Sequence, residues 1–144
     1  MTKVWIHTLI SIGCLALGPL HCELRAAGEA SFPPDFPVRV DPAQDEFCLI
    51  VVPDTQRYAA YFPEIFRTQF QWIRAAVAPL YVKFVIHVGD VVEEGRDDEW
   101  VVADQAFALL DGVVPYLVVP GNHDLDREAS RQGLRGTTGF NAVF

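Results

Sequence analysis

Hydrophobic residues in the central part of the chain gather in three short runs rich in β-branched side chains. The runs span Phe47–Val52, Val82–Val88 and Val114–Val119, and each is followed directly by a proline or a glycine. Runs of this length with such boundaries predict β-strands. Because they are nearly continuous rather than alternating, they are typical of strands covered on both faces.

Two stretches between these runs have helical spacing. Pro63 suits the first position of the first helix, and Asp97 or Asp98 can cap the second, with Glu99 and Asp104 expected on its solvent side. The apolar residues at helical spacing are Phe62, Phe66, Phe70, Ile73 and Val77 in the first stretch, and Trp100, Val101, Phe107 and Leu110 in the second.

The resulting order is strand, helix, strand, helix, strand. Consecutive strands joined through helices form right-handed crossovers and a parallel sheet. The pattern therefore predicts an α/β domain over residues 46–144, preceded by a proline-rich linker over residues 29–45.

The first 28 residues have the pattern of an export leader. Lys3 supplies a positive start, Val4–Leu20 is mainly apolar, and Ala26–Gly28 offers the small residues that a signal peptidase accepts. This predicts a signal peptide or membrane tether and hence an exported protein, periplasmic or secreted. The alternative is an N-terminal core helix. No second membrane span is expected after the leader.

The charge of the chain limits its partners. Nineteen acidic residues against eleven basic ones give a net charge of −8, which argues against binding to a nucleic-acid backbone. Such a chain can bind phosphate only if something supplies positive charge, and a bound metal ion is the usual source. Cys48 lies inside an apolar run, so a buried, inert thiol is expected there.

Polar side chains follow each predicted strand. Asp54 follows the first, Asp90 the second and Asn122 the third. The loops at the carboxyl ends of parallel strands lie at one edge of the sheet, where ligands bind. We therefore expect these three side chains to converge, and oxygen-bearing side chains that converge form a site for a hard divalent cation. Each residue alone has a simpler explanation as a turn former or a helix cap.

Three short sequence motifs resemble those of a known protein superfamily. Asp-Thr-Gln at residues 54–56, Gly-Asp-Val-Val-Glu at 89–93 and Gly-Asn-His-Asp at 121–124 resemble the first three motifs of the calcineurin-like metallophosphoesterase superfamily. The resemblance covers about Phe47–Asp124. It implies a four-layer α/β/β/α sandwich, of which this chain would supply the N-terminal half, and hydrolysis of phosphomonoesters or phosphodiesters with two metal ions.

The resemblance also implies roles for single residues. Asp54 and Gln56 would bind the first metal ion, Asp90 would bridge both ions, and Asn122 would bind the second. The superfamily usually has histidine where this chain has Gln56, and an amide oxygen favours manganese, magnesium or iron over zinc. The alternative for Gln56 is a hydrogen-bond donor behind the ligands.

Three more residues receive roles from the same resemblance. His123 would lie beside the phosphate and protonate or stabilise the leaving oxygen. Asp124 would orient the ring of His123, and Glu93 would support the Gly-Asp loop through a hydrogen bond. A phosphoester is then the expected substrate.

The superfamily also takes histidine ligands from later Gly-His and Gly-His-x-His motifs, and no histidine follows His123 in this sequence. We therefore expect a domain that stops before those ligands and is inactive alone. The alternative is a non-catalytic remnant or binding module of the same fold. His87 is expected to be a core or edge histidine rather than a substitute ligand. Three arginines after the last motif suit a solvated helical turn or, alternatively, a substrate-facing loop: Arg127, Arg131 and Arg135.

Overall fold

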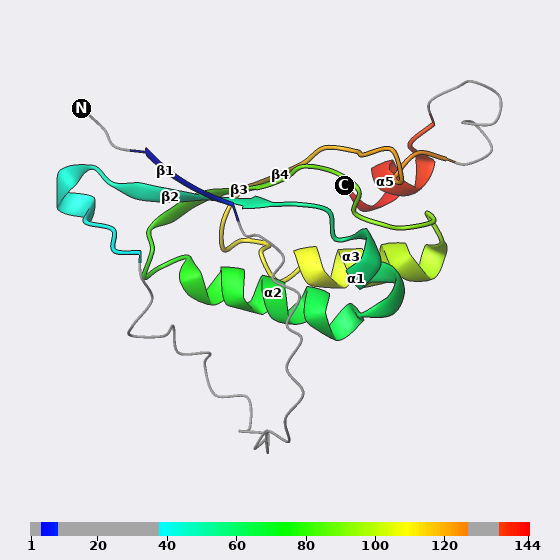
Figure 1. Cartoon of the computed structure of the whole chain (residues 1–144), viewed down its shortest axis with the longest axis horizontal. Coiled ribbons are helices and arrows are strands. Elements are labelled where there is room, and N and C mark those ends of the chain that lie inside the picture. The colour runs from blue at the N-terminus through cyan, green and yellow to red at the C-terminus, as the bar shows by residue number, and fades with distance from the viewer. Residues whose placement is uncertain (1–3, 9–37, 127–135) are drawn as a thin grey trace, which may run out of the picture.

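The computed structural model describes residues 4–8, 38–126 and 136–144 (Figure 1), with side chains from residue 38 onward. Most of the expected leader, the proline-rich part of the linker and the three arginines at 127–135 lie outside the described residues. The described part of the linker holds a short 3-10 helix, η1 (Pro42–Gln44).

Four parallel strands form the sheet. They are β1 (Val4–Thr8), β2 (Phe47–Val52), β3 (Val82–His87) and β4 (Tyr116–Val118), and they lie side by side in this order. The predicted parallel α/β arrangement is confirmed.

The last strand is shorter than its hydrophobic run. The N–H of Val114 donates to the carbonyl of Leu110 in the turn that ends the preceding helix. Pro115 follows and has no N–H to offer a neighbouring strand. Strand pairing therefore begins only at Tyr116, which lies opposite Val85.

Strand β1 comes from the segment expected to be a leader. It pairs in parallel with β2, with Val4 opposite Phe47 and Thr8 opposite Val51. The alternative of a core helix is wrong for these residues, whose β-branched and aromatic composition favours a strand. Export and cleavage of residues 1–28 stay predictions. Among the described residues, no helix is long and apolar enough to cross a membrane.

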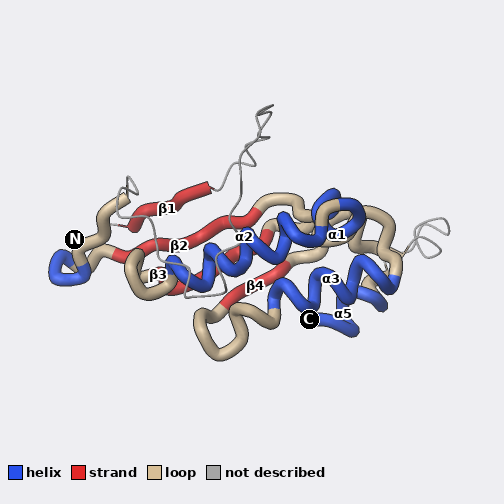
Figure 2. The backbone as a smooth tube through the Cα atoms, turned by 90° about the horizontal axis from the view of Figure 1, so that it is seen from below, coloured by secondary structure: helices blue, strands red, loops and turns tan. Residues whose placement is uncertain are grey.

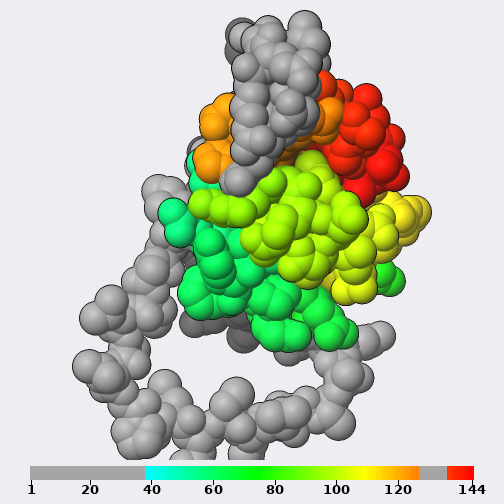
Figure 3. All heavy atoms as spheres, turned by 90° about the vertical axis from the view of Figure 1, so that its right-hand side faces the viewer, coloured from blue at the N-terminus to red at the C-terminus, as the bar shows by residue number. Residues whose placement is uncertain are grey.

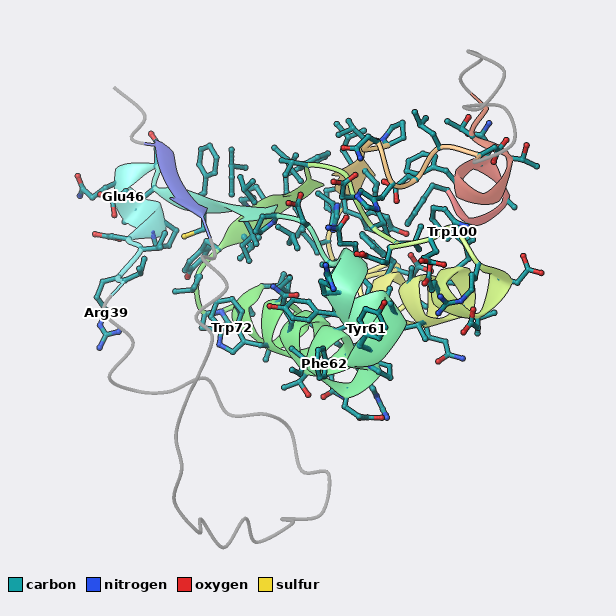
Figure 4. All side chains as sticks on the ribbon, turned by 45° about the vertical axis from the view of Figure 1, so that its right-hand side comes forward. Arg39, Glu46, Tyr61, Phe62, Trp72 and Trp100 are labelled. Atoms are coloured by element: carbon teal, nitrogen blue, oxygen red, sulfur yellow. The ribbon has the colours of Figure 1, made fainter. Side chains whose placement is uncertain are left out.

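Three helices cover one face of the sheet (Figures 1 and 2): α1 (Gln56–Tyr61), α2 (Pro63–Ala76) and α3 (Asp97–Phe107). Pro63 occupies the start of α2 as predicted. The C-terminal helix α5 (Thr138–Val143) packs on α3, where the ring of Phe140 lies 6.3 Å from that of Trp100, which is labelled in Figure 4.

The core lies between the sheet and these helices. Phe66 and Phe70 of α2 meet Phe107 of α3 edge to face, with ring centroids 6.3 and 4.6 Å from that of Phe107. Alternate residues of β2 are buried against them, including Ile50 and Val52. Burying each phenylalanine contributes roughly 1.5–3 kcal/mol, so this aromatic cluster fixes the two helices on the sheet.

Among the described residues only this one face of the sheet is covered, so the expectation of cover on both faces is wrong for this part of the chain. Most intervening residues of the strands are half-buried, Lys83 of β3 is exposed, and Leu117 of β4 is 50% exposed. An apolar strand pattern does not distinguish a covered face from an open one, which is why the sequence misleads here.

The start of α3 also differs from the prediction. The helix begins after Arg96 rather than being capped by Asp97 or Asp98. Glu99 is fully buried, because its carboxylate accepts the N–H of Glu94 at 2.8 Å and pairs with the Arg96 guanidinium at 3.0 Å. Val101 is exposed instead, whereas Trp100, Phe107 and Leu110 are buried as predicted.

Candidate metal centre

The loops that follow β2 and β3 are joined through the backbone of Asp90. The carbonyl oxygen of Asp90 accepts the N–H of Thr55 at 3.1 Å and the N–H of Gln56 at 3.0 Å. Asp90 reaches this position in a left-handed conformation with φ of 53°, directly after Gly89 with φ of 103°. A left-handed residue other than glycine costs roughly 1–2 kcal/mol, and such strain is concentrated at functional sites.

The loop after β4 packs against the same residue. The N–H of His123 donates to Asp90 Oδ1 at 2.9 Å. A Cβ atom on Gly121 would lie 2.1 Å from Asp90 Oδ1, and one on Gly89 would lie 2.7 Å from the nitrogen of Gly121. Glycine at both positions therefore permits the approach. The loops after β2, β3 and β4, called the first, second and third loops below, all meet around Asp90. Figure 3 faces this end of the molecule, with the second loop (yellow-green) beside the third (orange).

The four expected ligands lie on these loops. Asp54 and Asn122 are exposed, whereas Asp90 and Gln56 are half-buried. The side-chain oxygen of Gln56, Oε1, is buried and has no hydrogen-bond partner among the described residues. An unsatisfied buried acceptor is costly and calls for a partner, so this oxygen suits a cation or a polar ligand.

Histidine, cysteine and carboxylate side chains alone do not form a metal site in the described part of the chain. No group of three or more His, Cys, Asp or Glu side chains there lies close enough to hold a metal ion. The available donor set is two carboxylates, Asp54 and Asp90, with two amides, Gln56 and Asn122. These are oxygen ligands of the kind that magnesium and manganese accept.

Asp124 braces the second and third loops. Its Oδ1 accepts the N–H groups of Val91 at 2.8 Å and Val92 at 3.0 Å, and its Oδ2 accepts the N–H of Gly121 at 2.8 Å. Burial raises the pKa of Asp124, and the three backbone hydrogen bonds counteract part of that rise. The expected role of Asp124 was to orient the ring of His123, but its carboxylate is occupied by these backbone groups.

The ring of His123 is held by a backbone carbonyl instead. Its Nδ1 lies 2.6 Å from the carbonyl oxygen of Glu93. A carbonyl can only accept, so Nδ1 carries the proton and Nε2 is left for other contacts. The Glu93 carboxylate, expected to support the Gly-Asp loop, pairs with Arg57 at 3.5 Å. The Arg57 guanidinium also lies 5.9 Å from the ring centre of Tyr61, which is labelled in Figure 4.

His87 is a fully buried core histidine, as predicted. Its Nε2 lies 3.0 Å from Thr55 Oγ1, and its Nδ1 accepts the N–H of Gly89 at 3.2 Å. Burial lowers the pKa of His87 to about 4, with the charge of Asp90 acting in the opposite direction, so the ring is neutral at pH 7. Cys48 is also buried as expected, and burial raises the pKa of its thiol.

Sequence reasoning missed the contributions of Thr55, Arg57 and the Glu93 carbonyl. Thr55 is fully buried, and its hydroxyl donates to the carbonyl of Val91 at 3.2 Å. Its place between two expected ligands was the only signal that could have pointed to it. The other two act through contacts that depend on the tertiary arrangement, for which the sequence gives no signal.

Comparison with known proteins identifies the family. The profile of the calcineurin-like phosphoesterase family matches residues 49–142. The chain therefore belongs to the calcineurin-like phosphoesterase family, whose members are hydrolases that typically use divalent metal ions.

A curated relative is the uncharacterized protein YvnB of Bacillus subtilis (strain 168), which is 39% identical to this chain over 88 residues. The match covers 60% of this chain but only 7% of that protein. No solved structure matches the chain significantly.

Proposed function

We propose that these loops form part of a two-metal site for hydrolysis of phosphomonoesters or phosphodiesters. The observation that carries the proposal is the meeting of three loops around Asp90. The Gln56 side-chain oxygen, which is buried without a hydrogen-bond partner among the described residues, supports it. Membership of the family supports metal-dependent phosphoester chemistry.

In this proposal Asp54 and Gln56 would hold one divalent ion, Asn122 would hold a second, and Asp90 would contribute to both. The hard oxygen donors favour manganese, magnesium or iron over zinc. When bound, such ions would supply charge neutralisation for the phosphate oxygens and activation of a water molecule. The ions would also supply positive charge to a chain whose net charge is −8.

His123 is the proposed acid for the leaving group. Because Nδ1–H is held by the Glu93 carbonyl, the ring exchanges its second proton at Nε2. A protonated ring can then give that proton to the leaving oxygen, which contributes roughly 10²–10⁴-fold to such reactions. Asp124 supports this step indirectly, because it fixes the loop that carries His123 to the backbone of Val91 and Val92.

The test uses a chain extended to include the later histidine motifs, because residues 1–144 alone are expected to be inactive. It measures hydrolysis of bis-p-nitrophenyl phosphate and of p-nitrophenyl phosphate in the presence of Mn²⁺. Activity should disappear with a chelator and return when Mn²⁺ is restored. His123→Ala should lower the rate by about 10²–10⁴-fold while Mn²⁺ binding persists. Hydrolysis that survives chelation would refute the proposal, and loss of Mn²⁺ binding in His123→Ala would refute the role given to His123.

The alternative function is a binding module of the same fold without catalysis. The observation that favours it is the lack of any group of three His, Cys, Asp or Glu side chains suited to a metal ion in the described part of the chain. The same assay on the extended chain separates the two functions: an extended chain that binds phosphoesters without turnover, whatever metal is added, supports the binding module.

Export stays part of the proposal, on the pattern of residues 1–28. Cleavage there would remove β1 and leave β2 at the edge of the sheet. N-terminal sequencing of the protein recovered from its native cells tests this: a start near residue 29 supports cleavage, and a start at residue 1 refutes it.

A further inference from the structure

One buried polar group has no part in the chemistry proposed above. The ring of His87 is fully buried at the end of β3, and both of its nitrogens have partners: Gly89 N–H at Nδ1 and the Thr55 hydroxyl at Nε2. Two polar groups on different loops therefore fix the orientation of the ring.

The hydrogen bonds fix the protons of this network. The N–H of Gly89 can only donate, so Nδ1 of His87 accepts and the ring proton sits on Nε2. Nε2–H then donates to Thr55 Oγ1, whose own proton goes to the carbonyl of Val91. The result is one chain of hydrogen bonds with a single direction, from the end of β3 through the first loop to the second.

The groups in this hydrogen-bond network lie beside the expected ligands. Thr55 stands between Asp54 and Gln56, while Gly89 and Val91 stand on either side of Asp90. The hydrogen-bond network therefore connects the first loop to both neighbours of Asp90. It adds to the two backbone hydrogen bonds that the Asp90 carbonyl accepts from the first loop.

We propose that His87 and Thr55 are positioning residues that hold Asp54, Gln56 and Asp90 in the geometry needed to bind a divalent metal ion. The inference rests on the proposed function, because it concerns the same site. Groups that orient metal ligands from behind typically contribute 10–100-fold to metal affinity.

A packing role alone predicts something different. The His87 ring lies 5.7 Å from the ring of Phe107, so substitution of His87 disturbs the core as well as the network. Thr55 allows a cleaner test. Thr55→Val keeps the shape of the side chain and removes the hydroxyl, whereas Thr55→Ser keeps the hydroxyl and removes a methyl group.

The first experiment is calorimetric titration of the full chain with Mn²⁺. Thr55→Val should bind Mn²⁺ about 10–100-fold more weakly than wild type, and Thr55→Ser should bind within about threefold of wild type. Equal Mn²⁺ affinity in wild type and Thr55→Val would overturn the inference. A larger loss in Thr55→Ser than in Thr55→Val would also overturn it, because packing would then be the cause.

The second experiment does not depend on metal. Long-range ¹H–¹⁵N spectra of the metal-free chain should show His87 as the neutral tautomer with its proton on Nε2. Amide exchange at Thr55 and Gln56 should be about tenfold faster in Thr55→Val, as expected for loss of one buried hydrogen bond, and unchanged in Thr55→Ser. A proton on Nδ1, or unchanged exchange in Thr55→Val, would overturn the inference.

The two experiments separate two kinds of failure. If wild type binds no Mn²⁺, the proposed function fails, and the tautomer and the amide exchange still decide whether the network holds the loops. If wild type binds Mn²⁺ and Thr55→Val binds it equally well, the proposed function survives and the positioning role fails.

Discussion

Gly89 is the position where a single methyl group should do most damage to the candidate metal centre. Its φ of 103° is unfavourable for any residue with a Cβ, and a Cβ there would lie 2.7 Å from the nitrogen of Gly121. The backbone conformation costs roughly 1–2 kcal/mol for an L side chain. Forcing an extra carbon against a fixed backbone costs roughly 1–3 kcal/mol more. Gly89→Ala should therefore lower the free energy of unfolding by about 2–5 kcal/mol.

Gly112 supplies the matched control. It has a φ of 67°, and a Cβ at this position would meet nothing within 4 Å. Gly112→Ala should lose only the conformational part, roughly 1–2 kcal/mol. The gain from a stiffer unfolded chain is common to both substitutions and cancels in the comparison.

The assay is urea unfolding of wild type and both variants at 25 °C, followed by circular dichroism. Gly89→Ala should unfold at a clearly lower urea concentration than Gly112→Ala, with a similar m-value. Equal midpoints would show that the loops can separate at little cost, and the close packing around Asp90 would then not support the site.

Three further predictions concern buried groups. Glu99→Ala should lower the free energy of unfolding by about 1–3 kcal/mol, because it leaves two backbone N–H groups without their acceptor. Asp98→Ala on the exposed side should leave the urea midpoint nearly unchanged, and similar midpoints for the two variants would contradict the prediction. The pKa of His87 is lowered to about 4 from an ordinary 6.5, so its contribution to stability is full above pH 6.5 and is lost as the pH falls to about 4. Between pH 7 and pH 4 the unfolding free energy of wild type should therefore fall by up to about 3 kcal/mol relative to that of His87→Asn. Parallel curves for the two proteins would refute the lowered pKa of His87. The Cys48 residue is 1% exposed, so its thiol should react with Ellman's reagent only after urea unfolds the domain. Mass spectrometry identifies which cysteine is labelled, and rapid labelling of Cys48 in the folded chain would contradict its burial.

Much of the fold was predictable because its cause is local. The runs that became β2 and β3 match their strands to within one residue, since short apolar, β-branched runs with breakers at their ends have few alternatives. Helix α2 begins at Pro63 as predicted. Strand β1 was not predicted, because an apolar segment near the N-terminus has the same pattern whether it is exported or paired with a sheet.

The buried face of α3 was predicted correctly at Trp100, Phe107 and Leu110 but not at Glu99, for a different reason. Glu99 is charged, and a charged residue on a helix is usually exposed. Its burial depends on the Arg96 guanidinium and on two backbone N–H groups that only the folded loop brings within reach. The sequence shows the charge but not these partners.

The candidate site also has a part that the sequence predicts and a part that depends on the folded structure. Topology places the loops that carry Asp54, Asp90 and Asn122 at one edge of the sheet, and three residue types at three strand ends are enough to predict that meeting. The contact between the His123 ring and the Glu93 carbonyl involves a backbone group, so no residue type signals it. The role of Thr55 depends on a ring proton whose position follows only from the geometry around Gly89.

The most direct test of the central claim is a calorimetric titration of the purified chain with Mn²⁺, comparing wild type, Asp90→Asn and Asp104→Asn. Asp104 lies on the exposed side of α3 and serves as the control for loss of one carboxylate. The three-loop metal centre predicts that wild type and Asp104→Asn bind Mn²⁺ with the same affinity and that Asp90→Asn does not bind it. Binding that is equal in Asp90→Asn and wild type, or absent from wild type, would contradict the claim.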